Sequence, residues 1–120
     1  MTLKQGAAAA IHAVRGSNKM NDVRYELDGQ LFVWDSVKYD MNVKKHKVNF
    51  EEAATVFMGE NTEYYKDKEH SDDEERFIIV GNSDQLRALM VCHCLRENET
   101  VIRIISARKA GKYEEKRKWR

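Results

Sequence analysis

The chain has 120 residues, which is enough for one domain and too short for two ordinary ones. Hydrophobic residues make up 42% and charged residues 34%, and the apolar residues come in runs, which excludes full disorder and predicts a modest core under a charged surface. The net charge is only +1 and indicates no class of partner, although residues 103–120 are strongly basic and residues 60–75 acidic, so one face can still be strongly positive.

The first thirty residues differ in composition from the rest, and we expect them to form a flexible leader (1–30) before a domain at 31–120. Helix-prone alanines at 7–10 are followed by helix-breaking residues at 16–18, and translation could instead begin at Met20. The apolar stretch 7–11 is too short for a signal peptide, and no anchor segment follows. A soluble, cytoplasmic protein without membrane association is therefore expected.

Two short helices joined by a tight turn are predicted after a first strand. Residues 31–34 are apolar, aromatic and β-branched, which is typical of a strand. Asp35 then stands at the N-cap position of a basic helix that ends near His46. Asn49 can cap a second helix, in which apolar residues recur at helical spacing until Gly59 stops it.

Four strand candidates and a closing helix follow. The order β-α-α-β-β-β-β-α predicts an α+β two-layer domain with an antiparallel sheet, in which three central strands form a meander and the others lie at the edges. The two N-terminal helices and the C-terminal helix would cover this sheet. The predicted strands are 61–65, 77–80 (ending at a turn cluster, 81–84), 88–95 and 101–106, and the helix is 107–119.

Basic residues of the first predicted helix form one candidate for a phosphate-binding group. Lys38 and Lys45 are seven residues apart and share a helix face, close to His46. Histidine can exchange a proton near neutral pH, so this group could contribute to catalysis. The alternative is an ordinary solvated helix face.

Three arginines form a second candidate group. Arg76 begins one predicted strand, Arg103 lies within another, and Arg108 starts the last predicted helix. The planar guanidinium fork binds phosphate oxygens in pairs. Arg103 stands between two isoleucines and must point away from the core, either into a site or towards the wet face of a half-covered sheet.

Acidic and thiol groups give two further hypotheses. Glu75 lies at a strand entrance, where it could act as a general base or form a salt bridge with a neighbouring arginine. Cys92 and Cys94 flank His93 in a spacing that does not suit a zinc site, and in a strand the histidine points opposite to both thiols. We expect reduced cysteines, no metal and no cofactor, with His93 on the surface or in a site.

This inventory of arginines, lysines and histidines on a small sheet suits metal-independent RNA cleavage. Such cleavage needs a base to activate the 2′-hydroxyl, an acid for the 5′-oxygen and cations for the pentacoordinate phosphate. No single cluster identifies the reaction.

Three ordered blocks of sequence resemble the signatures of the BrnT toxins, and together they cover roughly residues 31–116. The first block is Phe32-x-Trp34-Asp35-x-x-Lys38, then Asn42 and Lys45-His46-x-Val48-x-Phe50-Glu51-Glu52-Ala53; the second is His70-Ser71-Asp72-Asp73-Glu74-Glu75-Arg76-Phe77 with Gly81; the third is Arg103-Ile104-Ile105-Ser106-Ala107-Arg108-Lys109-Ala110 with Glu114 or Glu115.

The resemblance implies a RelE-like fold and an endoribonuclease toxin of a type II toxin–antitoxin system, which cleaves RNA and inhibits translation and growth. It also implies a BrnA-type antitoxin with a ribbon-helix-helix DNA-binding domain. In this family the two proteins form a higher-order complex that represses its own operon, so contact with operator DNA would come through the antitoxin.

Site roles follow from residue type and position in the family blocks. His46 is the first candidate for proton transfer, with Glu75 or His93 as its partner. The cations expected to hold the scissile phosphate and stabilise its developing charge are Lys38, Lys45, Arg76, Arg103 and Arg108.

The chain also departs from the family pattern. The family usually has Gly after the histidine of the first block, where this chain has Lys47, so a helix ending there would lose its preferred left-handed cap at a cost of roughly 1 kcal/mol. After His93 the family often has Thr-Glu, where this chain has Cys94 and Leu95. These departures near His46 and His93 leave open an inactive toxin-like module that only binds its antitoxin. A general RNA-binding domain is disfavoured because the sheet lacks interleaved exposed aromatics for base stacking.

Overall fold

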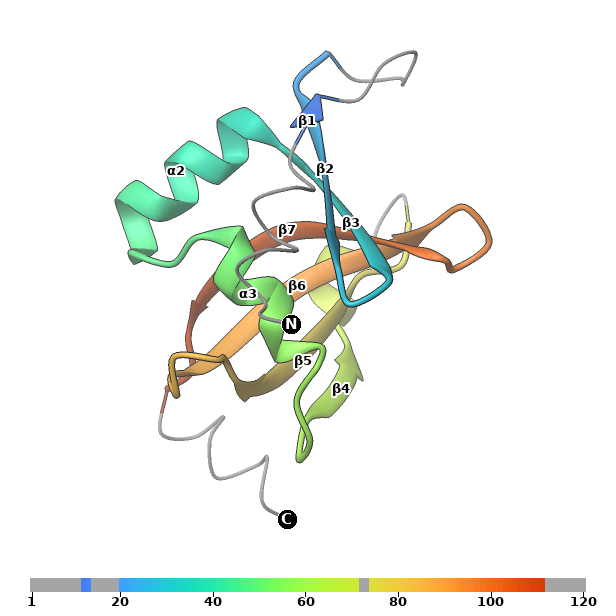
Figure 1. Ribbon diagram of the computed structural model, residues 1–120. Coiled ribbons are helices and arrows are strands. Elements are labelled where there is room, and N and C mark those ends of the chain that lie inside the picture. Colours follow the sequence, from blue (N-terminus) through green and yellow to red (C-terminus); the bar gives the residue numbers. More distant parts are fainter. Residues whose placement is uncertain (1–11, 14–19, 72–73, 112–120) are drawn as a thin grey trace.

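The computed structural model describes residues 12–13, 20–71 and 74–111. Within these ranges, seven strands form one sheet in the order β1-β2-β3-β7-β6-β5-β4 (Figure 1). No helix in the described ranges is long and apolar enough to cross a membrane. The elements are β1 (His12–Ala13), β2 (Asp22–Leu27), β3 (Gln30–Asp35), α2 (Ser36–His46), α3 (Phe50–Val56), β4 (Glu63–Lys66), the 3-10 turn η1 (Lys68–His70), β5 (Phe77–Asn82), β6 (Ala88–Arg96) and β7 (Val101–Lys109).

The α+β class was predicted correctly, but the sheet is mixed and not wholly antiparallel. Strands β4 to β7 pair antiparallel in sequence, as expected for the meander. An antiparallel hairpin of β2 and β3 lies at the other side of the sheet, and β3 joins β7 in parallel, with Phe32 opposite Ile102. Within the sheet, the meander and the hairpin are therefore joined by the pairing of β7 with β3, two strands that lie far apart in the sequence.

The expected leader does not extend to residue 30, because β2 belongs to the folded domain. Val23, Tyr25 and Leu27 alternate with polar residues, and Tyr25 and Leu27 are buried in the core. This period-two pattern is that of a half-covered strand. Most of the remaining leader, residues 1–11 and 14–19, lies outside the described residues.

The closing helix was predicted to begin at Ala107, and this start is wrong. Strand β7 continues to Lys109, since Val91 and Leu89 of β6 pair with Ala107 and Lys109. Ala107 is buried in the core at 1% exposure. Residues 112–119 of the predicted helix lie outside the described residues.

Both N-terminal helices begin where their caps were predicted. The Asp35 side chain accepts a hydrogen bond from the backbone N–H of Lys38 at 2.9 Å, and Asn49 accepts one from Glu52 at 2.7 Å. Each bond satisfies a backbone donor that has no partner within its helix. The C-cap of helix α2 is Lys47 in the left-handed conformation, with φ 60° and ψ 34°. This is the conformation expected at a position where the family usually has glycine. Helix α3 ends at Val56, before Gly59.

The helices cover one face of the sheet, and the core lies between the two layers (Figure 1). Helix α3 supplies a nearly continuous apolar surface to it, whereas α2 buries only Asn42 fully. The core joins side chains of both helices, of the β2–β3 hairpin and of the meander: Tyr25, Leu27, Phe32, Trp34, Val48, Phe50, Ala53, Ala54, Val56, Ile79, Leu89, Val91, Ile104 and Ala107.

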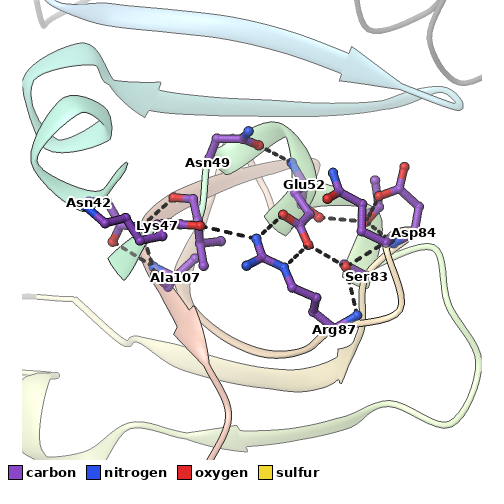
Figure 2. A network of polar contacts seen from close by, with 11 residues as sticks. Asn42, Lys47, Asn49, Glu52, Ser83, Asp84, Arg87 and Ala107 are labelled. Carbon is purple, nitrogen blue, oxygen red and sulfur yellow. Dashed lines mark hydrogen bonds and ion pairs between the residues drawn. The ribbon is translucent and has the colours of Figure 1, made fainter. Parts of the chain in front are cut away.

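Two polar networks connect the helices to the strands (Figure 2). The Asn42 amide donates to the carbonyls of Val48 and Ala107 and accepts from the Ala107 N–H at 3.0 Å. Glu52 of α3 binds Arg87 in an ion pair and accepts a hydrogen bond from Ser83 at 2.6 Å. Both networks involve buried or nearly buried groups, and the hydrogen bonds satisfy the polar atoms that folding removes from water.

Candidate active site

A β-bulge in β7 decides which side chains reach the face of the sheet opposite the helices. Ser106 pairs with Cys92 and Ile104 pairs with His93, so β7 carries one residue more than β6 at this point. The extra residue is Ile105. Beyond it, Ala107 enters the core, while Ser106 and Arg108 project to the opposite face.

That opposite face contains a pocket of about 390 Å³, which we call the open-face pocket. Its floor is formed by side chains of β5, β6 and β7 that alternate with core residues, and its rim by the segment between β4 and β5. The lining residues are Asp67, Glu69, His70, Arg76, Ile78, Met90, Cys92, Ile105, Ser106 and Arg108.

Hydrogen bonds hold the ends of the rim segment together. The backbone N–H of Asp67 donates to the carbonyl of Arg76 at 2.8 Å. The Ser71 hydroxyl donates to the Asp67 carbonyl at 2.6 Å and accepts from the Arg76 N–H at 3.0 Å. These bonds bring His70 of η1 and Arg76 to the same side of the pocket although they are six positions apart.

His70 is oriented by a carboxylate within this rim. Its Nδ1 lies 3.0 Å from Oδ2 of Asp67, whose side chain is 12% exposed, whereas the imidazole is 61% exposed. An ionised carboxylate can only accept, so Nδ1 carries the hydrogen, and in the neutral ring Nε2 carries the lone pair. The exposed ring can therefore exchange a proton through Nε2 while Asp67 fixes its tautomer.

Two guanidinium groups from different elements enter the same pocket. Arg76 comes from the rim, and Arg108 comes from β7, where its Nη1 also donates to the Lys109 carbonyl at 3.2 Å. Within the described part of the chain, no ion pair engages the guanidinium of Arg76. Two arginines on one pocket can bind a phosphate and stabilise negative charge that develops on it.

The thiol in the pocket is not set up as a nucleophile. Burial raises the pKa of Cys92 to about 11, and the nearby Asp67 carboxylate adds to this rise. Its Sγ lies 3.8 Å from Oδ2 of Asp67, to which it donates. A thiol with such a pKa stays protonated near neutral pH, and the thiolate is the reactive form.

The structure brings only Arg76 and Arg108 of the predicted site residues together in the pocket. Lys38, Lys45 and His46 lie on α2, in the layer that covers the other face of the sheet (Figure 1). Both lysines are exposed, and His46 is half-buried at the end of the helix. This helix group and the pocket lie on opposite faces of the sheet.

His93 and Arg103 are buried and lie outside the pocket. His93 is 2% exposed and packs edge-on against Phe57 with ring centroids 4.8 Å apart. Burial lowers the pKa of His93, so the ring is neutral at pH 7. Neither predicted place for Arg103, a site or the wet face of the sheet, is found, because at 8% exposure its Nη2 binds Oδ1 of Asp22 at 3.0 Å.

Glu75 forms a salt bridge, as in the alternative to a catalytic role, but its partner is a lysine and not the neighbouring arginine that was expected. Its carboxylate lies 2.9 Å from Nζ of Lys66, with both side chains largely exposed. The neighbouring Glu74 binds Arg96, and the hydrogen bonds from Arg96 hold the pKa of Glu74 below its usual value. Neither glutamate lines the open-face pocket.

Sequence reasoning missed His70 and Asp67 as site residues. His70 opens the second signature block and precedes Arg76 by six positions, so its presence in that block was the available signal. In the described part of the chain, no three His, Cys, Asp or Glu side chains lie close enough together to hold a metal ion.

Comparisons with known proteins agree with this architecture. A family model described as ribonuclease toxin, BrnT, of type II toxin-antitoxin system matches residues 34–114. A crystal structure of the Brucella abortus ribonuclease toxin, BrnT, at 1.1 Å resolution is similar with a TM-score of 0.50 and 18% identity, over 66% of this chain and 94% of that chain. At this identity the structural likeness supports the fold alone. No curated protein matches the sequence.

Proposed function

Because the chain belongs to the BrnT family of ribonuclease toxins of type II toxin–antitoxin systems, we propose that it is an endoribonuclease whose reaction takes place in the open-face pocket. The observation that carries this assignment is the convergence of Arg76, Arg108 and the carboxylate-oriented His70 in one pocket. These are the cations and the proton-exchanging group that RNA cleavage requires.

The proposed reaction is attack of a ribose 2′-oxygen on the adjacent phosphorus. His70 takes the proton of the 2′-hydroxyl through Nε2, and the imidazolium that forms is stabilised by Asp67. The bond from phosphorus to the 5′-oxygen breaks, and the leaving oxygen takes a proton from solvent. The products are a 2′,3′-cyclic phosphate and a 5′-hydroxyl. Arg76 and Arg108 stabilise the charge of the pentacoordinate phosphate, and no metal ion takes part in these steps.

The test is cleavage of a defined RNA by the purified, antitoxin-free protein, with and without a metal chelator. We expect cleavage in both conditions, and a loss of about 100-fold or more in the H70A, R76A and R108A variants. The arginine control is R24A in β2. H46A separates the two histidines, because a rate that falls in H46A and not in H70A would move the site to α2.

We also propose that a BrnA-type ribbon-helix-helix antitoxin neutralises the chain and contacts operator DNA on behalf of the complex. Support comes from the toxin–antitoxin family to which the chain belongs. To test this, the protein encoded in the same operon is added to the cleavage reaction. We expect RNA cleavage to stop. If the well-folded chain does not cut RNA even with ribosomes supplied, yet binds that protein, it is a partner-binding module.

A further inference from the structure

The open-face pocket contains a carboxylate that the proposed cleavage does not use. Asp67 is engaged by His70 and Cys92. Glu69, in the same 3-10 turn as His70, also lines the pocket, and within the described residues no hydrogen bond or ion pair engages its carboxylate. Glu69 is exposed, so its side chain is available to a ligand.

A carboxylate beside a phosphate site needs a chemical explanation, because it repels the phosphate that the arginines attract. A ligand that gains from Glu69 must therefore present hydrogen-bond donors a short distance from its phosphate. In RNA, the ribose hydroxyls can donate but are the same in every nucleotide, whereas the N–H donors on the Watson–Crick edges differ between the bases.

The floor of the pocket suits a flat ring. Ile78, Met90 and Ile105 contribute apolar side chains from three neighbouring strands, beside the polar rim. The volume of about 390 Å³ is within the range of small-molecule sites, which are typically apolar with a few placed polar groups. A base can therefore lie on this floor while its edge meets the rim.

We propose that the open-face pocket binds guanine next to the scissile phosphate, with the Glu69 carboxylate accepting hydrogen bonds from N1–H and the N2 amino group. This inference rests on the proposed function, since it names the base that the same site recognises. Guanine is the base that offers two parallel N–H donors to one carboxylate. Adenine and cytosine present an amino group beside a ring acceptor, and uracil presents one N–H between two carbonyls, so each would leave a carboxylate oxygen facing an acceptor.

The cleavage test uses short RNAs that differ only at the base beside the cut. We expect kcat/KM to be at least tenfold higher for guanosine than for adenosine, cytidine or uridine, since a site built to hydrogen-bond a substrate rejects bases that lack its donors. Inosine, which keeps N1–H but lacks the amino group, should fall several-fold below guanosine. In E69Q the advantage of guanosine should disappear, while E60Q, an exposed glutamate outside the pocket, should keep it. An unchanged guanosine preference in E69Q, or no preference in the wild type, overturns the proposal.

A binding experiment separates this proposal from the proposed cleavage. Guanosine, inosine and adenosine 3′-monophosphates are titrated into the ¹⁵N-labelled protein, and shifts of Glu69, Arg76 and Met90 amides are followed by NMR. Tighter binding of the guanosine compound that is lost in E69Q supports guanine recognition even if the wild type cuts no RNA. Equal binding of all three compounds, with RNA cleavage intact, leaves the ribonuclease proposal standing and overturns the guanine site.

Discussion

At the scale of single residues, the buried Glu52 shows how one ion pair sets the response of the fold to acid. Burial acts to raise the pKa of Glu52, but hydrogen bonds from Arg87 and Ser83, with the Arg87 charge, outweigh it and hold the pKa below its usual value. The stabilisation by this group is therefore complete above the unfolded value of about 4.3 and is lost as the pH falls through the lower folded value.

Replacement of Arg87 by Met should destabilise the fold by about 2 kcal/mol at pH 7, because Glu52, at 4% exposure, is left buried without its cation. Burial then dominates and raises the pKa of Glu52, so this penalty is largest at pH 7 and shrinks as the pH falls towards about 4. Urea unfolding at pH 7, 5.5 and 4 measures the difference between variant and wild type, with R24M as the matched control. A difference that does not depend on pH would contradict the assignment.

At the scale of elements, the end of α2 carries a cost that the sequence itself indicates. Lys47 has φ 60°, a conformation that glycine adopts without the penalty of a Cβ atom. K47G should therefore stabilise the protein by about 1 kcal/mol, while K44G, inside the last turn of the same helix, should destabilise it by a similar amount. Thermal and urea unfolding of the two variants check this opposite pair of signs, and a loss of stability in K47G would refute it.

Asn42 closes an open edge of the sheet. Strand β3 pairs with β7 only as far as Val33 and Arg103, so Ala107 lies beyond the end of its strand partner. There the Asn42 side chain replaces the partner strand, with Nδ2 2.8 Å from the Ala107 carbonyl and Oδ1 3.0 Å from the Ala107 N–H. Part of the first family block is therefore structural in this chain.

N42A should cost about 2–4 kcal/mol of unfolding free energy, because it leaves the backbone of Ala107 and the carbonyl of Val48 without these bonds in a buried region. M41A, at the neighbouring exposed position, should change stability by less than about 0.5 kcal/mol. Unfolding by urea measures both variants. Similar small effects of the two variants would show that water can replace the hydrogen bonds of Asn42 to the backbone of Ala107.

The helices were predictable because their signals are local. Asp35 and Asn49 each lie three positions before the N–H that they cap, so a short stretch of sequence contains the whole interaction. The prediction ended strand β7 at residue 106, three residues too early, because the run Ala107–Lys109 has no local strand signal. Its conformation is decided by the pairing of β7 with β6. Gly81 was interpreted as a turn residue but lies in β5, where an added Cβ would meet Cγ2 of Thr62 at 2.7 Å.

The site was only partly predictable for a related reason. Residue type pointed to Arg76 and Arg108, which both line the candidate pocket, but not to which face of the sheet or which layer each candidate occupies. His46 is on a helix of the covering layer, and His93 points into the core, so neither meets the two arginines. The pairing of β3 with β7 also has no local signal, since it joins residues about seventy positions apart in the chain.

At the scale of the whole molecule, a net charge of +1 means that the proposed RNA binding depends on a few local cations. If two arginines each contact one phosphate, the logarithm of the affinity for a short RNA should fall with the logarithm of the salt concentration with a slope of about −1.4. R76A and R108A should each reduce this slope to about −0.7, while R24A should leave it unchanged. The slope is measured by titrating a short fluorescent RNA, at several salt concentrations, with proteins that all carry H70A so that the RNA is not cut. A much steeper slope would indicate a wider basic surface.

The bulge at Ile105 also has a consequence for how this gene can change. Arg103 and Arg108 are five positions apart, an odd spacing that would send them to opposite faces of a regular strand, yet both point away from the helices because β7 has one extra residue between them. Loss of the Ile105 codon would remove the bulge and leave a regular pairing of β7 with β6, with Ala107 still in the core and Arg108 still on the opposite face. The bulge is therefore the point at which evolution can change the length of this strand by one residue without reversing the side chains beyond it.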